Sequence, residues 1–233
     1  MAASPRRVGA ETSKTRDVLI DSVERLMSEE GYASVTYRAV AAKAGVTPSL
    51  VQYYFPTLDD IFLATIRRRT DRNVTRLTEA LEEHPDDPLR VLWQFSWAEA
   101  TGALITEFMA LGNHRKSIRA EIAEATEKVR RVQLDALERR FAKGVHLPEG
   151  ELSPGALLLL ITGIPKFLNL EEGIGVKTAH GEVVEAFERY LGAQSRAATF
   201  ANASHPRGVL AAEPPTQPIC PSPPATTRDS PVM

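Results

Sequence analysis

The chain has 233 residues, of which 43% are hydrophobic and 25% charged, and its formal net charge is −2. This composition is typical of a globular protein with one large or two small domains, and it excludes nucleic-acid binding through an overall basic charge. The only cysteine, Cys220, excludes a disulfide framework and a cysteine-based metal or redox pair. The longest apolar run, residues 156–161, is much shorter than the roughly 20 residues of a membrane span, so we expect a soluble, cytoplasmic protein.

The apolar residues recur at spacings of three and four, and no stretch alternates as a β-strand does, so the pattern predicts an all-α fold. The first expected helix covers residues 14–30 and ends at Gly31. Its apolar face consists of Val18, Leu19, Ser22, Val23, Leu26 and Met27.

Two short helices are expected next, on either side of Gly45. Thr36 is a good N-cap for the first of them, YRAVAAKA. Thr47 is placed to cap the second, SLVQYYF, with Pro48 at its first position, and Pro56 ends it.

A longer helix should start at Thr57, which with Asp60 forms a capping-box pattern, and should continue to about residue 83. Further helices are expected at residues 89–113, with a possible break near Gly102, and at 117–143, 153–170 and 180–193. The Pro-rich remainder has too few large apolar residues to order itself, and we expect it to be disordered.

Two short helices around a glycine turn have the geometry of a helix-turn-helix, in which the second helix reads bases in the major groove of DNA. On that helix Leu50, Val51 and Tyr54 are candidates to face the core. Pro48, Ser49, Gln52 and Tyr53 then lie nearer the groove, where Gln52 could pair with adenine. The alternative is that these polar residues form a solvated helix face and that Tyr53 and Tyr54 simply pack.

The run GYASVTYRAVAAKAGVTPSLVQYYFPTLDDIFLA resembles the DNA-binding domain of the tetracycline-repressor (TetR) family, over about residues 15–65. This resemblance implies backbone contacts by Thr36 and Tyr53. It implies contacts to bases or backbone by Thr47, Pro48, Ser49 and Gln52, with a contribution from Arg38. Two positions depart from the family, because Gln52 replaces a common aromatic residue and Leu58 replaces a common lysine.

The same resemblance implies a repressor that forms a homodimer through residues 153–170 and 180–193 and has a ligand cavity in each subunit. A two-fold dimer should bind a palindromic operator in double-stranded DNA. The apolar run ALLLLITGI suits a helix buried both in its own subunit and in a dimer, although a buried helix of a monomer is an alternative.

The middle helices concentrate side chains that suit an apolar or amphipathic effector: Trp93, Trp97, Thr101, Phe108, Met109 and Phe167. Core packing explains them equally well. Few fixed charges are expected nearby, and no cofactor or metal is expected. No catalytic motif is present, so we do not expect an enzyme. The alternatives to a regulator are a helical structural or interaction protein without a ligand and, with less support, an enzyme.

These inferences divide the chain into four parts. Residues 1–12 form a flexible basic arm with Arg6 and Arg7, and residues 13–62 form the helix-turn-helix domain. Residues 63–195 form a helical domain for effector binding and dimerisation, and residues 196–233 form the disordered tail.

Overall fold

The computed structural model describes residues 5–100, 104–142 and 152–203, and within these ranges it describes the side chains of residues 14–193. The described residues are helical almost throughout and form no β-strand, which confirms the predicted all-α fold. The elements are α1 (Pro5–Glu30), the 3₁₀ helix η1 (Tyr32–Ser34), α2 (Tyr37–Ala44), α3 (Pro48–Tyr54), α4 (Leu58–Glu83), α5 (Pro88–Ala100), α6 (Leu104–His114), α7 (Lys116–Ala142), α8 (Pro154–Gly173) and α9 (His180–Ala203).

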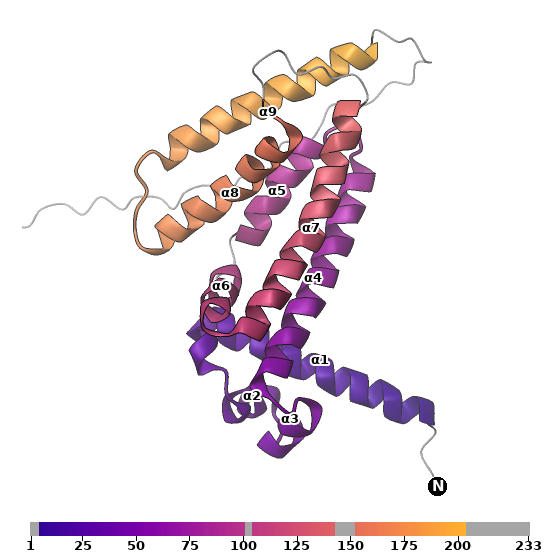
Figure 1. The fold of residues 1–233 in the computed structure, drawn as a ribbon, viewed down its shortest axis with the longest axis vertical. Helices are drawn as coiled ribbons and strands as arrows, with labels where there is room; N and C mark the ends of the chain where they lie inside the picture. Colours follow the sequence, from indigo (N-terminus) through magenta and orange to yellow (C-terminus); the bar gives the residue numbers. More distant parts are fainter. Residues whose placement is uncertain (1–4, 101–103, 143–151, 204–233) are drawn as a thin grey trace, which may run out of the picture.

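The long helices α4 and α7 pack side by side and connect the two ends of the molecule (Figure 1). At the lower end, α1 crosses α4, and α2 and α3 lie below it. At the upper end, α5 and α8 pack on one side of α4 and α7, with α9 beyond them, while α6 lies beside the lower part of α7, near α1. The short helices α2 and α3 are therefore presented at one extremity.

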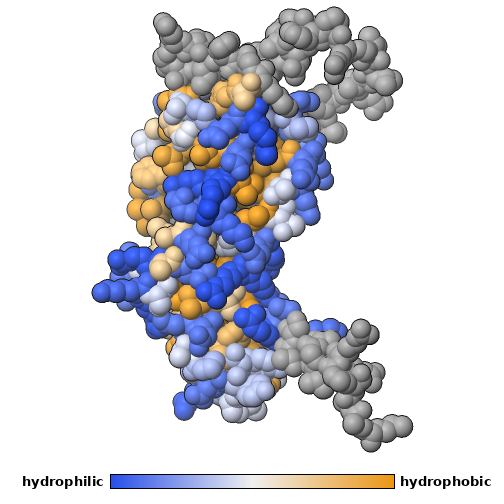
Figure 2. Space-filling view, turned by 45° about the vertical axis from the view of Figure 1, so that its right-hand side comes forward, coloured by the Kyte–Doolittle hydropathy of each residue, from blue (hydrophilic) through white to orange (hydrophobic). Residues whose placement is uncertain are grey.

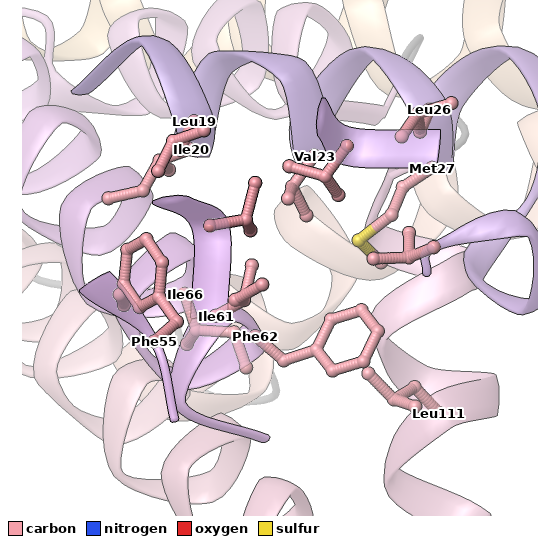
Figure 3. Packing of buried hydrophobic residues seen from close by; sticks show 14 of the residues in the cluster. Leu19, Ile20, Val23, Leu26, Met27, Phe55, Ile61, Phe62, Ile66 and Leu111 are labelled. Atoms are coloured by element: carbon pink, nitrogen blue, oxygen red, sulfur yellow. The ribbon is translucent and has the colours of Figure 1, made fainter. Parts of the chain in front are cut away.

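The lower core joins α1, α2, α3 and the start of α4 to residues from much later in the chain. Leu104, Phe108 and Leu111 of α6 and Ile118 of α7 belong to the same buried cluster. Figure 3 shows Leu111 next to the ring of Phe62. The predicted domain boundary at residue 62 therefore does not divide this core, because α6 is packed into it.

A second core fills the upper body. It includes Leu77 of α4, Trp93 of α5, Leu137 of α7, Ile161 of α8 and Leu191 of α9. Helix α4 contributes to both cores, since its first turns lie in the lower one and its later turns in the upper one. It is thus a continuous connection between the two.

Two predicted helix ends were wrong. Helix α1 begins at Pro5 and not near residue 14, and proline is favourable at the first position of a helix. Helix α9 continues to Ala203 and not only to residue 193, in keeping with the alanines of its last turns. Helix α5 ends at Ala100 and α6 begins at Leu104, and Gly102, near which a break is predicted, lies outside the described residues. Residues 1–4 of the arm and 204–233 of the tail lie outside the described residues.

The apolar face of α1 also differs from the prediction in two positions. Val18 is 47% exposed, whereas Ile20, which the prediction left out, is fully buried. The face is wide enough to bury both Leu19 and Ile20 against the lower core.

Candidate nucleic-acid interface and internal cavity

The first short helix, α2, begins as the sequence predicts. The Thr36 hydroxyl oxygen accepts a hydrogen bond from the backbone N–H of Ala39 at 3.1 Å, which confirms Thr36 as its N-cap. Thr36 and Arg38 are both exposed.

The turn after α2 requires glycine. Gly45 has φ of 69°, in the left-handed region, and its N–H bonds back to the carbonyls of the last turn of α2. Val40 and Ala41 of α2 and Val51 of α3 are buried, so the two short helices pack against each other and the core across this turn. This is the predicted helix-turn-helix geometry.

Thr47 occupies the N-cap position of α3, with Pro48 as the first helical residue, but its side chain does not cap the helix. The Thr47 hydroxyl instead lies 3.1 Å from the hydroxyl of Ser49. Both hydroxyls face solvent, and the capping role predicted for the Thr47 side chain is not observed.

The exposed side of α3 contains Pro48, Ser49, Gln52 and Tyr53. The Tyr53 ring packs edge to face on the Tyr54 ring, with the ring centroids 5.4 Å apart, yet Tyr53 remains 77% exposed. Packing therefore does not account for Tyr53. A large, amphipathic side chain left in solvent at this place is available for a partner.

Tyr37 fixes the two short helices relative to each other, a role that the sequence analysis did not assign. Its hydroxyl donates to the carbonyls of Phe55 at 3.1 Å and Pro56 at 2.8 Å, which connects the start of α2 to the end of α3. Burial of the Tyr37 side chain also raises its pKa. An ion pair between Lys43 and Glu29 further ties α2 to α1.

A partly open cavity of about 130 Å³ lies in the body, between α4, α5, α6, α7 and α8. One part of its lining is apolar, from Ile66, Phe95, Ile105, Phe108, Ile122, Ala125 and Val129. The other part is polar or charged, from Arg69, Thr70, Asn73, Ser96, Glu99, Thr126, Arg130, Gln133, Thr162 and Lys166. The expectation of few fixed charges near the cavity was wrong, because four of these residues are ionisable.

The predicted lining residues are dispersed. Phe108 lines the cavity, whereas Trp93 and Trp97 pack in the upper core with ring centroids 5.6 Å apart. The indole N–H of Trp93 donates to Glu188 of α9 at 2.6 Å. Met109 and Phe167 are exposed, at 56% and 58%. Thr101 lies outside the described residues.

Helices α8 and α9 expose apolar side chains on one side of the body. Leu159, Phe167 and Leu170 are each more than half exposed, and Val183 of α9 is 38% exposed. A shallow cleft that includes Leu159, Phe167 and Val183 runs between the two helices. Figure 2 shows apolar side chains reaching the surface of the upper body among hydrophilic ones.

No group of side chains in the described ranges has the composition of a metal site. Likewise, none of the helices between residues 5 and 203 that the structure describes combines the length and apolar character needed to cross a membrane.

Residues 19–65 match a family model described as "Bacterial regulatory proteins, tetR family". The chain is 26% identical over 159 residues to the HTH-type transcriptional regulator AcrR of Shigella flexneri, which covers 66% of this chain and 73% of that protein. It is 36% identical over 61 residues to the HTH-type transcriptional regulator BetI of Rhizobium meliloti, which covers 26% of this chain and only 30% of that one.

Solved structures share the fold at lower identity. A TetR transcription regulator from Haloarcula marismortui superposes with a TM-score of 0.60 at 17% identity, over 82% of this chain and 98% of that one. A transcriptional regulator from Saccharomonospora viridis, in complex with choline, superposes with a TM-score of 0.58 at 14% identity, over 81% of this chain and 95% of that one.

Proposed function

We propose, from the premise that this chain belongs to the tetR family of bacterial regulatory proteins, that it is a repressor which binds a palindromic operator as a homodimer and is released by a small molecule. The observation that supports this most is the packed pair α2 and α3, joined through Gly45, with exposed polar and aromatic side chains on the outer side of α3. A cytoplasmic protein, with access to chromosomal DNA, is part of this proposal.

The DNA contacts follow from exposure and chemistry. Thr36 and Tyr53 would contact phosphates, and Arg38 would add a charge-assisted contact. Thr47, Pro48, Ser49 and Gln52 would contact bases or backbone. The Gln52 amide can donate to and accept from one adenine, which makes it the best candidate for direct base reading.

The apolar side of α8 and α9 would form the dimer interface. Single exposed apolar residues need no explanation, but Leu159, Phe167 and Val183 lie on two helices around one cleft, and Leu170 is exposed on the same α8. A two-fold axis through such a surface would pair it with its own copy and place two α3 helices against two half-sites of an operator.

The cavity is the proposed effector site. One structural neighbour holds choline, which supports the idea that a body of this fold takes a small molecule. Helix α6 lines the cavity through Ile105 and Phe108 and also packs into the lower core with α1 to α4. A ligand that prefers a different position of α6 would therefore change the placement of α3.

Selection of bound sequences from random DNA, followed by footprinting, tests this function. We expect enrichment of an inverted repeat and protection of both half-sites. Protection of one asymmetric site by a single chain would contradict the homodimer. Absence of any enriched sequence would contradict DNA reading and favour a helical protein with another role.

A further inference from the structure

The cavity carries an excess of positive charge. Its ionisable lining residues are three cations, Arg69, Arg130 and Lys166, and one carboxylate, Glu99. Fixed charges in such a partly enclosed site act more strongly than in water, so their balance should decide which ligand enters.

The single carboxylate is already neutralised by the protein. Glu99 Oε2 accepts from Arg69 Nη2 at 2.7 Å and from the Asn73 amide at 2.7 Å, while its Oε1 lies 3.5 Å from Arg76 Nη1. The Glu99 side chain is only 18% exposed. A cationic ligand would have to compete with two arginines for this carboxylate.

The other two cations of the lining, Arg130 and Lys166, are not neutralised in this way. Among the described residues, neither Arg130 nor Lys166 has a carboxylate within ion-pair distance. Although Lys166 is exposed as a residue, partial burial of its ammonium group and the nearby charge of Arg130 lower its pKa, against the smaller opposite effect of Glu99. An anion between Arg130 and Lys166 would remove this repulsion.

A buried amide completes the polar side. Gln133 lies one turn after Arg130 on α7, is only 7% exposed and lines the cavity. Its amide is not among the buried side-chain groups of the described residues that lack a partner, but its place in the cavity lining allows it to meet a ligand or water. Its N–H groups can donate to an anion.

The aromatic side chains do not form a cage for a quaternary ammonium group. The guanidinium of Arg76 lies over the ring of Phe95, 5.7 Å from its centroid, and so occupies one face of it. Phe108 is 4% exposed and packs in the lower core. Recognition of such a cation needs several free aromatic faces.

We propose that the effector of this chain is a small carboxylate with an apolar body, held at its carboxylate by Arg130, Lys166 and Gln133 and at its body by the apolar lining near Ile105 and Ile122. This rests on the proposed function and names the ligand class of its effector site. The cavity volume of about 130 Å³ is close to that of an engineered cavity of about 150 Å³ that holds benzene, so the body is of that size.

The test uses the full-length chain and compounds matched in size but not in charge. Benzoate and hexanoate are titrated calorimetrically against benzyl alcohol, hexanol, benzylamine and hexylamine. We expect the two carboxylates to bind at least tenfold more tightly than the alcohols, and the amines to bind most weakly. Tighter binding of an amine or an alcohol, or no binding of either carboxylate, would overturn the proposal.

Substitutions of the lining residues then test which side chains bind the carboxylate of the ligand. Arg130→Gln and Lys166→Gln should each weaken carboxylate binding roughly tenfold or more, with Arg130→Lys retaining part of it. The matched control is Arg131→Gln, because Arg131 is the exposed neighbour on α7 and does not line the cavity. Equal affinities in all of these variants, with unchanged circular dichroism, would refute the assigned site.

Operator binding without ligand separates the two proposals. If the selected operator is bound but carboxylates are not, only the ligand class is wrong. If carboxylates bind and no DNA sequence is selected, the ligand class stands and the proposed repressor function fails.

Discussion

The Glu107 carboxylate accepts a hydrogen bond from the backbone N–H of Tyr32 at 2.7 Å, across a separation of 75 residues in sequence. Glu107 belongs to α6, whose neighbours Ile105 and Phe108 line the cavity, and Tyr32 belongs to η1, directly after α1. This contact therefore joins the candidate effector site to the DNA-binding end of the molecule.

Glu107→Ala should weaken the response to ligand more than it weakens operator binding itself. The substitution leaves the Tyr32 N–H without its acceptor, at a cost of about 1–3 kcal/mol in unfolding free energy. It also removes one connection between α6 and the DNA-binding end, so the ligand-induced loss of operator affinity should become smaller. Gel-shift titrations of the operator with and without ligand measure this loss of affinity. Glu107→Gln, which keeps an acceptor, is the control, and an unchanged ligand response in Glu107→Ala would contradict the assigned coupling.

Gly31→Ala should destabilise the protein by at least about 1 kcal/mol. Gly31 has φ of +83°, which L-residues rarely adopt, and an added Cβ would lie 3.3 Å from Glu107 Oε2. Thermal unfolding measures the loss. Gly181→Ala is the matched control, because Gly181 lies at the start of α9 with open space around its Cβ position. Equal melting temperatures for the two variants would show that the turn at Gly31 tolerates a side chain.

Gln52 and Tyr53 should have separable effects on DNA binding. Gln52→Ala should relax base preference at one position of each half-site, with a loss of about 1–3 kcal/mol in discrimination. Tyr53→Phe should lower the affinity for all DNA sequences equally, because a phosphate contact carries no sequence information. Affinities for the selected operator and for random DNA distinguish the two. Equal losses on both DNAs for Gln52→Ala would remove its role in base reading.

Asp59 should make the junction of α4 with α6 and α7 sensitive to acid. It accepts from the Ser117 hydroxyl at 2.7 Å and pairs with Arg115, and these contacts lower the pKa of Asp59. Because the folded-state pKa is depressed, the stabilisation is complete above the unfolded pKa of about 4 and is lost as the pH falls through the lower folded value.

Asp59→Asn should therefore lower the free energy of unfolding by about 1 kcal/mol at neutral pH. The difference in this free energy between the variant and the natural chain should shrink below about pH 4. Urea unfolding across this pH range measures both free energies. Asp135→Asn, on the exposed side of α7, serves as the control and should change stability by less than about 0.5 kcal/mol. A difference that grows on acidification would contradict the assigned pKa shift.

Local signals in the sequence were sufficient for the DNA-binding end. The Thr36 cap, the Gly45 turn and the Thr57 to Asp60 capping box each depend on residues within a few positions of one another, and all three are observed. The Thr47 side chain is the exception, because its hydroxyl pairs with Ser49. Tyr37 was missed, since its acceptors lie 18 and 19 residues away.

The cavity could not be predicted in this way, because its lining comes from five helices whose rotations are set by packing. Aromatic content favoured Trp93, but that side chain is better satisfied in the core beside Phe187 and Glu188. One usable signal was overlooked. Arg69 and Asn73 lie four residues apart on one side of α4, a helix that packs against several others. Polar residues in such a position indicate an internal polar site.

Phe167→Glu should dissociate the proposed homodimer into monomers. Phe167 is 58% exposed on α8 beside the cleft shared with α9, so a charge there is harmless in a monomer but would be desolvated in a two-fold interface, where it would appear twice. Sedimentation equilibrium should give the mass of two chains for the natural protein and of one chain for the variant. Met109→Glu is the control, since Met109 is 56% exposed on α6, away from this cleft, and should leave the dimer intact. Operator affinity should fall with the dimer in Phe167→Glu, because a single α3 helix then meets only one half-site. A Phe167→Glu protein that remains dimeric would mean that the copies associate through another surface, and the apolar side chains on α8 and α9 would then need a different partner.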